Sequence, residues 1–317
     1  YKFADKVCFI TPASFLFNAG KTPKKWNAKM LNDKHLKVAY YEQDSSNVFP
    51  NTDIKGGVAI TYRDAQKNFG KIGTFTHFEE LNSALRKVLN SEKFCSIDEI
   101  YFGQEKFNLD VLYMKNPEAK NIVGSEGKEK RLTSSIFGQL EDVFSKNRKN
   151  ETDFKILGVI KNRRKWRYIN SEYIEEHPNL RKFKVMLPGS NGSGAIGEVL
   201  STPLVGEPLV GEPLVGEPLV GHTQTFISFG AFDNREEAEN LLKYIKTKFA
   251  RTMLGTLKIT QSNKKDTWRN VPLQNFTNNS DIDWSQPIAQ IDQQLYKKYG
   301  LSEKEIAFIE EKVREME

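Results

Sequence analysis

Cysteine and histidine are scarce in this chain of 317 residues, which contains two of the first and four of the second. Two cysteines, Cys8 and Cys95, are too few for a disulfide framework, so a reducing cytoplasm is the expected location. Both have apolar or aromatic neighbours, and we expect buried structural thiols. The histidines are scattered without a CxxC or HExxH pattern, which argues against a metal site. No apolar run approaches the roughly 20 residues of a membrane helix, and the N-terminal residues do not resemble a signal peptide.

Basic residues exceed acidic ones, with 47 Lys and Arg against 41 Asp and Glu and a net charge of +6. This excess permits a polyanionic partner without requiring one. The length suits one large domain or two of medium size.

The first seventy residues alternate strand and helix signals. This order is typical of the terminal portion of an α/β sheet, and residues 7–10 suit a strand buried on both faces. The predicted elements are a strand at 7–10, a helix marked by Trp26, Met30 and Leu31, and strands at 36–41 and 57–62.

Further elements are predicted from periodicity. In the middle of the chain we predict helices at 77–90 and around Ile136, Leu140 and Phe144, and short strands or buried turns at 97–102 and 109–114. A strand is predicted at 182–187, and a helix runs from Asp233 through Met253 with a capping box at Asp233 and Glu236. A loop at 277–287 precedes a helical tail with a capping box at Ser302 and Glu305.

A low-complexity element follows the glycine-rich segment PGSNGSGAIG. From Pro203 to Gly221 the unit PLVGE recurs every five residues, which excludes a continuous helix or a central strand and leaves an extended or turn-rich path. The repeat is either a length-tunable spacer or a solvent-exposed expansion. The upstream signature Gly192-x-Gly194-x-x-Gly197 favours a loop over a nucleotide site, because no helix can follow it for long before Pro203.

Two basic and aromatic clusters are candidate nucleic-acid contacts, since arginine clamps phosphates and aromatic rings stack on bases. The alternative is a solvated strand edge kept basic against aggregation. The first cluster is Lys161, Arg163, Arg164, Lys165, Trp166, Arg167 and Tyr168, and the second is Lys264, Lys265, Trp268 and Arg269. A weaker pattern, Asp110 followed by Glu118 and Lys120, would suit a magnesium-dependent nuclease or a helix surface.

The segments VCFITPASFLF (7–17) and LKVAYYEQDSSNVFPNTDIKGGVAITYRD (36–64) resemble the end of the catalytic domain in adenine-specific DNA methyltransferases of restriction–modification systems. In that family this stretch follows an Asn-Pro-Pro-Tyr motif and supplies outer strands of the sheet, including an antiparallel hairpin. The phenylalanine of the VFP signature packs against the flipped-out adenine. The resemblance therefore implies that Phe49 stacks on the flipped base.

The later segments ILGVIKNRRKWRYI (156–169), HTQTFISFGAF (222–232), VPLQNF (271–276) and the tail resemble the target-recognition region of the same enzymes. The implied fold class is an α/β remnant, comprising the last strands of a Rossmann-like sheet, followed by an α+β recognition domain. The implied domains are the catalytic portion at 1–72, a connecting first layer at 73–150, the recognition domain at 151–285 with the repeat at 203–221, and a helical tail at 286–317.

This sequence departs from the family in having neither Asn-Pro-Pro-Tyr nor an N-terminal glycine-rich loop for the methyl donor S-adenosylmethionine. The parent protein is therefore expected to be an enzyme, whereas this chain alone is not. The expected partners are double-stranded DNA and a complementary chain with the catalytic half. Without preceding strands, the apolar surface of residues 7–10 should lie open. A stand-alone specificity subunit and a nuclease segment are the alternatives.

Overall fold

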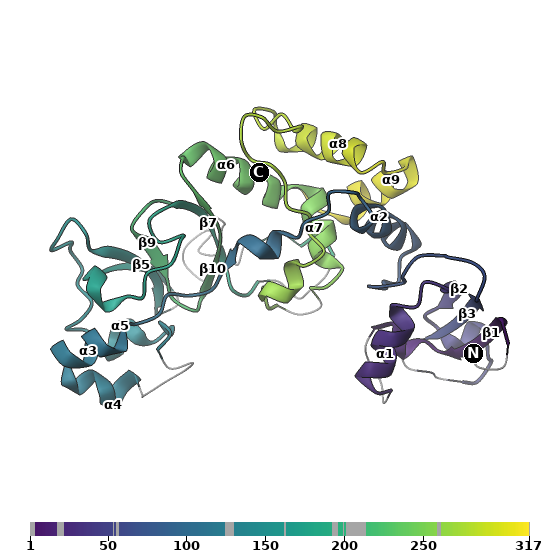
Figure 1. Ribbon diagram of the computed structural model, residues 1–317, viewed down its shortest axis with the longest axis horizontal. Coiled ribbons are helices and arrows are strands. Elements are labelled where there is room, and N and C mark those ends of the chain that lie inside the picture. Colours follow the sequence, from purple (N-terminus) through teal and green to yellow (C-terminus); the bar gives the residue numbers. More distant parts are fainter. Residues whose placement is uncertain are drawn as a thin grey trace. The chain divides into compact units, whose positions relative to one another are not determined.

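The computed structural model describes residues 4–17, 22–52, 54, 57–123, 130–161, 163–191, 196–198, 200, 214–258 and 261–316. The chain forms two compact units, Tyr1–Arg86 and Lys87–Glu317, which are described separately below (Figure 1). Helix α2 (Glu79–Leu89) contains the boundary between them, and it confirms the helix predicted at 77–90.

The first unit is built on a three-stranded antiparallel sheet in the order β1-β3-β2. Its strands are β1 (Lys6–Pro12), β2 (Leu36–Glu42) and β3 (Val58–Asp64), and its helices are η1 (Ala13–Phe17), α1 (Lys24–Leu31) and η2 (Ser45–Asn47). Strands β1 and β2 both run antiparallel to β3 and hence parallel to each other. Their core includes Phe15, Leu16, Met30, Leu31 and Leu36.

The strands and the helix predicted for this unit are confirmed, but the predicted burial of residues 7–10 is wrong. Strand β1 lies at the edge of the sheet, where Phe9 is 51% and Ile10 54% exposed. Cys8 is also exposed and Cys95 is half-buried, so the expectation of two buried thiols is wrong as well. The exposure agrees with the other expectation stated for residues 7–10, namely an open apolar surface. Within the described sheet, β1 pairs with β3 alone.

The second unit contains two sheets, in the orders β4-β10-β7-β8 and β6-β5-β9. The strands are β4 (Tyr101–Phe102), β5 (Phe154–Ile160), β6 (Arg163–Ile169), β7 (Phe183–Pro188), β8 (Leu214–Gly216), β9 (Val220–His222) and β10 (Phe226–Phe232). Leu157, Met186, Val220 and Phe226 form one cluster that packs the two sheets together. The structure thus has a mixed α/β architecture with several sheets.

The last two units of the repeat form strands. Leu214–Gly216 pairs antiparallel with β7, and Val220–His222 pairs parallel with β5. Both are extended and lie at the edges of their sheets, which agrees, for these two units, with the prediction of an extended path that is not a central strand. A Cβ atom at Gly216 would lie 2.8 Å from the Met186 sulfur, so a larger residue there would displace the Met186 side chain. The earlier units, 203–213, lie outside the described residues.

Short helices cover the remaining face of the β5–β6 hairpin (Figure 1). They are α3 (Leu109–Lys115), η4 (Pro117–Ala119), α4 (Lys120–Val123), α5 (Ile136–Gln139) and η5 (Ser171–Tyr173), and each contributes a side chain to this core or packs one against it. The short helix η3 (Ile97–Ile100) contacts β10 instead. Residues 109–114 are helical rather than extended. The helix predicted around Ile136 is a single turn. Leu140 and Phe144, which were expected on the same helix, lie beyond its end and pack into the same core.

The C-terminal helices are α6 (Arg235–Lys246), α7 (Lys248–Gly255), η6 (Lys265–Trp268), α8 (Ile288–Lys298) and α9 (Glu303–Lys312). The single helix predicted from Asp233 through Met253 is wrong. Thr247 is extended (ψ 148°), and its side chain accepts a hydrogen bond from the Ala250 amide to start α7. Asn234, rather than Asp233, caps α6. The capping box at Ser302 and Glu305 is confirmed.

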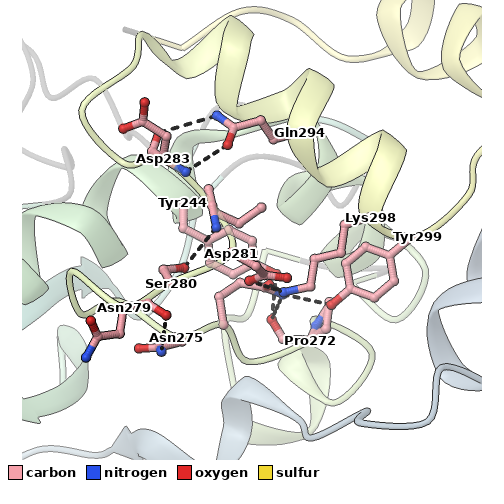
Figure 2. Close-up of polar contacts among 12 residues, drawn as sticks. Tyr244, Pro272, Asn275, Asn279, Ser280, Asp281, Asp283, Gln294, Lys298 and Tyr299 are labelled. Atoms are coloured by element: carbon pink, nitrogen blue, oxygen red, sulfur yellow. Dashed lines mark hydrogen bonds and ion pairs between the residues drawn. The ribbon is translucent and has the colours of Figure 1, made fainter.

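The predicted loop at 277–287 is confirmed, and polar contacts hold it against α8 (Figure 2). The Gln294 amide oxygen accepts a hydrogen bond from the Asp283 amide at 2.7 Å. Lys298 pairs with Asp281 at 2.8 Å. Nearby, the buried Tyr244 hydroxyl donates to the Pro272 carbonyl at 2.6 Å, which fixes α6 to the preceding segment.

Candidate nucleic-acid interface

Phe49 lies in the loop that joins β2 to β3. Two residues at the start of this loop organise it. Asp44 accepts hydrogen bonds from the Ser46 amide and hydroxyl, which lowers the pKa of its carboxyl group. The Ser45 carbonyl accepts from the Phe49 amide at 2.8 Å, while the Ser45 hydroxyl donates to the Thr52 carbonyl at 2.7 Å. The loop is therefore held by its own hydrogen bonds, and the Phe49 side chain is 40% exposed.

The end of the loop requires a glycine. Gly57 has φ +79°, and a Cβ atom there would lie 2.3 Å from the Glu42 carbonyl oxygen. The Gly57 carbonyl accepts a hydrogen bond from the Ala13 amide at 2.9 Å, which ties the loop to the segment after β1. The ends of the loop are thus joined closely, and Phe49 is presented from a fixed base.

An aromatic cluster lies at the carboxyl end of β2, where the Phe49 loop begins. The rings of Phe17 and His77 stack at 4.6 Å, and the Tyr41 hydroxyl lies 2.8 Å from His77 Nδ1. Burial lowers the pKa of His77. Strands β1 and β2 both end at this edge of the sheet, since each runs antiparallel to β3. Sequence reasoning missed this cluster because its members are separated by up to 60 residues and share no motif.

The first basic cluster lies on the β5–β6 hairpin, in its turn and along β6. Lys161 lies in the turn with φ +48°, and alternate residues of β6 point to opposite faces. Arg163 and Lys165 are exposed, as is Lys161. These three cations lie at the surface of the hairpin.

The other members of this cluster pack within the protein. Trp166 belongs to the cluster between the two sheets, and the Lys155 ammonium lies 4.7 Å from the centre of its ring. Arg164 lies over Phe226, Arg167 over Phe137, and Arg148 over Tyr168, at 5.6 to 6.0 Å. Cation–π contacts therefore anchor the hairpin, while its exposed cations remain on its surface.

The second cluster lies on η6, which packs against η3 and α7. Lys264, Lys265 and Arg269 are exposed, and Arg269 pairs with Asp266 at 3.1 Å. Trp268 is 1% exposed and lies 4.7 Å from Phe229, ring centre to ring centre. Its ring is a core side chain, so this cluster presents cations without an accessible aromatic ring.

The other sequence patterns give no comparable arrangement. Asp110, Glu118 and Lys120 are exposed on α3, η4 and α4. In the part of the chain that the structure describes, no group of three or more His, Cys, Asp or Glu side chains could hold a metal ion. Gly192 and Gly194 lie outside that part. Gly197 packs against Val313, whose Cα would lie 2.7 Å from an added Cβ.

Comparison with known proteins connects the N-terminal segment to one family. Residues 1–49 match the model of the Eco57I restriction-modification methylases. The segment contains β1, α1 and β2 and ends on Phe49. No curated protein sequence matches the chain.

Among solved structures, the type IIG restriction endonuclease BpuSI is similar, with 11% sequence identity and a TM-score of 0.33. The match covers 97% of this chain and 47% of that enzyme, so the chain spans about half of its length. Across the described residues, no helix is long and apolar enough to cross a membrane.

Proposed function

We propose that this chain is the DNA-recognition part of an adenine-specific DNA methyltransferase of a restriction–modification system, together with the last stretch of its catalytic domain. One observation carries the proposal. The segment that matches the methylase family ends on Phe49, and the loop beyond β2 presents this ring at the surface from a hydrogen-bonded base. A phenylalanine in that position can stack on an extruded adenine.

The proposed organisation places the catalytic portion at residues 1–72 and the recognition domain at 151–285. The connecting layer is proposed at 73–150; residues 73–86 of this range lie in the first compact unit, whereas Phe107, Ile136 and Phe144 share a core with Phe154 of β5. Residues 286–317 form the helical tail that packs on α6 and α7. The exposed cations of the hairpin and of η6 would bind phosphates, giving salt-dependent affinity for double-stranded DNA in the cytoplasm.

S-adenosylmethionine is the methyl donor that this family implies, and the residues of this chain do not fit it. The sequence contains no Asn-Pro-Pro-Tyr, and its one glycine signature includes Gly197, which packs against Val313 near the C-terminus rather than opening a helix. Donor binding and methyl transfer are therefore assigned to the full-length protein or to a complementary chain.

Phosphate binding by the hairpin is tested by fluorescence anisotropy of the complete chain with a labelled 24-base-pair duplex in 50–300 mM KCl. The variant Arg163→Ala/Lys165→Ala should bind more weakly and with a salt slope reduced by about 2. The matched control, Lys297→Ala/Lys304→Ala, removes two exposed cations from α8 and α9. Equal salt slopes for both variants would exclude the hairpin as a phosphate-binding surface. A wild-type chain that fails to bind DNA at 50 mM KCl would overturn the proposed function.

The role of Phe49 is tested with a duplex that contains one unpaired adenine. Stacking of a base on an aromatic ring is worth about 1–3 kcal/mol, so Phe49→Ala should lose a preference of that size for the unpaired adenine over the fully paired duplex. Phe49→Tyr should keep it, because the ring is retained. A Phe49→Ala chain with undiminished preference would remove Phe49 from the interface.

Two alternatives remain distinct in outcome. A stand-alone specificity subunit would bind DNA without turnover, which separates it from a nuclease. A nuclease would cleave DNA with magnesium and lose this activity in Asp110→Ala, although the exposed positions of Asp110 and Glu118 give that alternative no structural support.

A further inference from the structure

The second unit contains a pocket of about 470 Å³ whose lining includes no residue of the two basic clusters. Its lining includes Phe102, Gln104, Lys106, Arg131, Glu175 and His177. No pattern in the sequence marks it, because the lining comes from three segments up to 76 residues apart. The pocket contains two cations, an amide and stacked rings, a combination that suits an anionic ligand with a planar group.

The backbone fixes the two cations side by side. Residues 105–107 run between residues 130–132 and 173–175, with bridges from Lys106 to Arg131 and from Phe107 to Ile174. Glu105 and Phe107 are buried, whereas Lys106 between them is exposed, as is Arg131. Neighbours across a bridge point to the same face. Lys106 and Arg131 therefore project together from the same side of this small sheet.

The aromatic wall of the pocket rests on a buried charge. The rings of Phe102 and His177 stack at 5.6 Å and 19°. His177 Nε2 is hydrogen-bonded to the Glu105 carboxylate, which also accepts from the His222 amide at 3.3 Å. Glycine is required at position 221, because a Cβ atom there would lie 2.7 Å from Glu105 Cγ. The last unit of the repeat thus helps to hold the ring that lines the pocket.

The acidic residues of the pocket are offset by partners of their own. Glu175 pairs with Lys130 at 2.6 Å, and Glu176 pairs with Arg181. Within the described residues, neither Lys106 nor Arg131 has an ion-pair partner. The pocket therefore has an excess of positive charge at its exposed rim.

We propose that this pocket is a nucleotide subsite for duplex DNA, in which Lys106 and Arg131 bind neighbouring phosphates and Gln104 meets a base edge beside the Phe102 ring. A glutamine amide offers a donor and an acceptor together, which is the pattern that an adenine edge matches. Phosphate contacts set the position of the strand and base contacts give specificity. The inference rests on the proposed DNA-recognition function and adds a second contact surface to it.

The phosphate contacts are tested with the complete chain in the anisotropy titration described above. Lys106→Ala/Arg131→Ala should bind the mixed-sequence duplex at least about tenfold more weakly at 50 mM KCl, with a salt slope reduced by about 2. Lys297→Ala/Lys304→Ala is the charge-matched control, and thermal melts establish that each variant is folded. If wild type binds and the two double variants behave alike, this pocket is not a subsite, while the proposed function stands.

The base contact is tested by selecting bound duplexes from a library with randomised positions. Gln104→Ala should relax the preference at one position by about 5- to 150-fold and leave the salt slope unchanged, because Gln104 is neutral. Unchanged preferences at every position would overturn the role of Gln104. A wild-type chain that binds no duplex would overturn the proposed function itself, so the two failures are distinguishable.

Discussion

Asp292 of α8 is a buried carboxylate whose ionisation should make the second unit less stable at neutral pH. The residue is 2% exposed and accepts hydrogen bonds from the Lys248 and Phe249 amides, at 3.0 and 2.8 Å, so it caps the start of α7. Burial raises the pKa of its carboxyl group from 3.8 to about 6, although the two amides favour the charged form. The informative perturbation is Asp292→Asn, which keeps the shape and removes the ionisation.

The sign and size of the effect follow from linkage. A folded-state pKa above the unfolded value contributes stability that is fully present below about pH 4 and is lost as the pH rises through about 6. A shift of about two pH units corresponds to about 3 kcal/mol in the free energy of unfolding. The asparagine variant has no such term. Its free energy of unfolding relative to wild type should therefore rise by about 3 kcal/mol between pH 4 and pH 7.5.

The assay is urea unfolding of the complete chain across this pH range, followed by tryptophan fluorescence in a Trp26→Phe background. The remaining tryptophans, Trp166, Trp268 and Trp284, all belong to the second unit, so the signal reports that unit alone. Loss of a capping hydrogen bond in the variant lowers its free energy of unfolding by the same amount at every pH. Wild-type and variant curves that stay parallel from pH 4 to pH 7.5 would refute the reasoning.

Three further predictions concern close contacts and the repeat. Gly57→Ala should destabilise the first unit by about 1–3 kcal/mol, because φ +79° and the Glu42 carbonyl both exclude a side chain; an unchanged Trp26 fluorescence transition would contradict this. Gly221→Ala should lower the free energy of unfolding by about 1–3 kcal/mol through overpacking on Glu105, measured in urea. Deleting residues 208–212 should change it by less than about 1 kcal/mol, because the identical following unit still supplies β8; a larger loss would mean that the repeat length matters for folding.

Local chemistry in the sequence was sufficient for several elements. The capping box at Ser302 and Glu305 involves neighbours three residues apart, so its pattern predicted the start of α9 correctly. The helix predicted from periodicity at 77–90 and the strand predicted at 36–41 likewise correspond to α2 and β2. Thr247 shows the limit of such reasoning. The apolar stripe continues through it, but its extended backbone and the cap from Asp292 of α8 divide the helix.

The same limit applies to the candidate interface. Composition and the VFP signature identified Phe49 and the basic clusters, which are properties of single segments. Exposure was decided by the tertiary packing: Trp166 and Trp268 lie against side chains from other strands, whereas Lys161, Arg163 and Lys165 are exposed.

The sequence by itself indicated the methyltransferase-like segments at 7–17 and 36–64, of which residues 1–49 match a methylase family model, and it determined the basic character of β6 and several strand-forming regions of both units. Only the tertiary structure decided that β1 lies at an exposed edge, that repeat units close two separate sheets, and that Lys106 and Arg131 stand side by side on one pocket. The physical reason is the range of the interactions. Caps and periodic faces act over a few residues, while strand order and burial depend on partners tens of residues away.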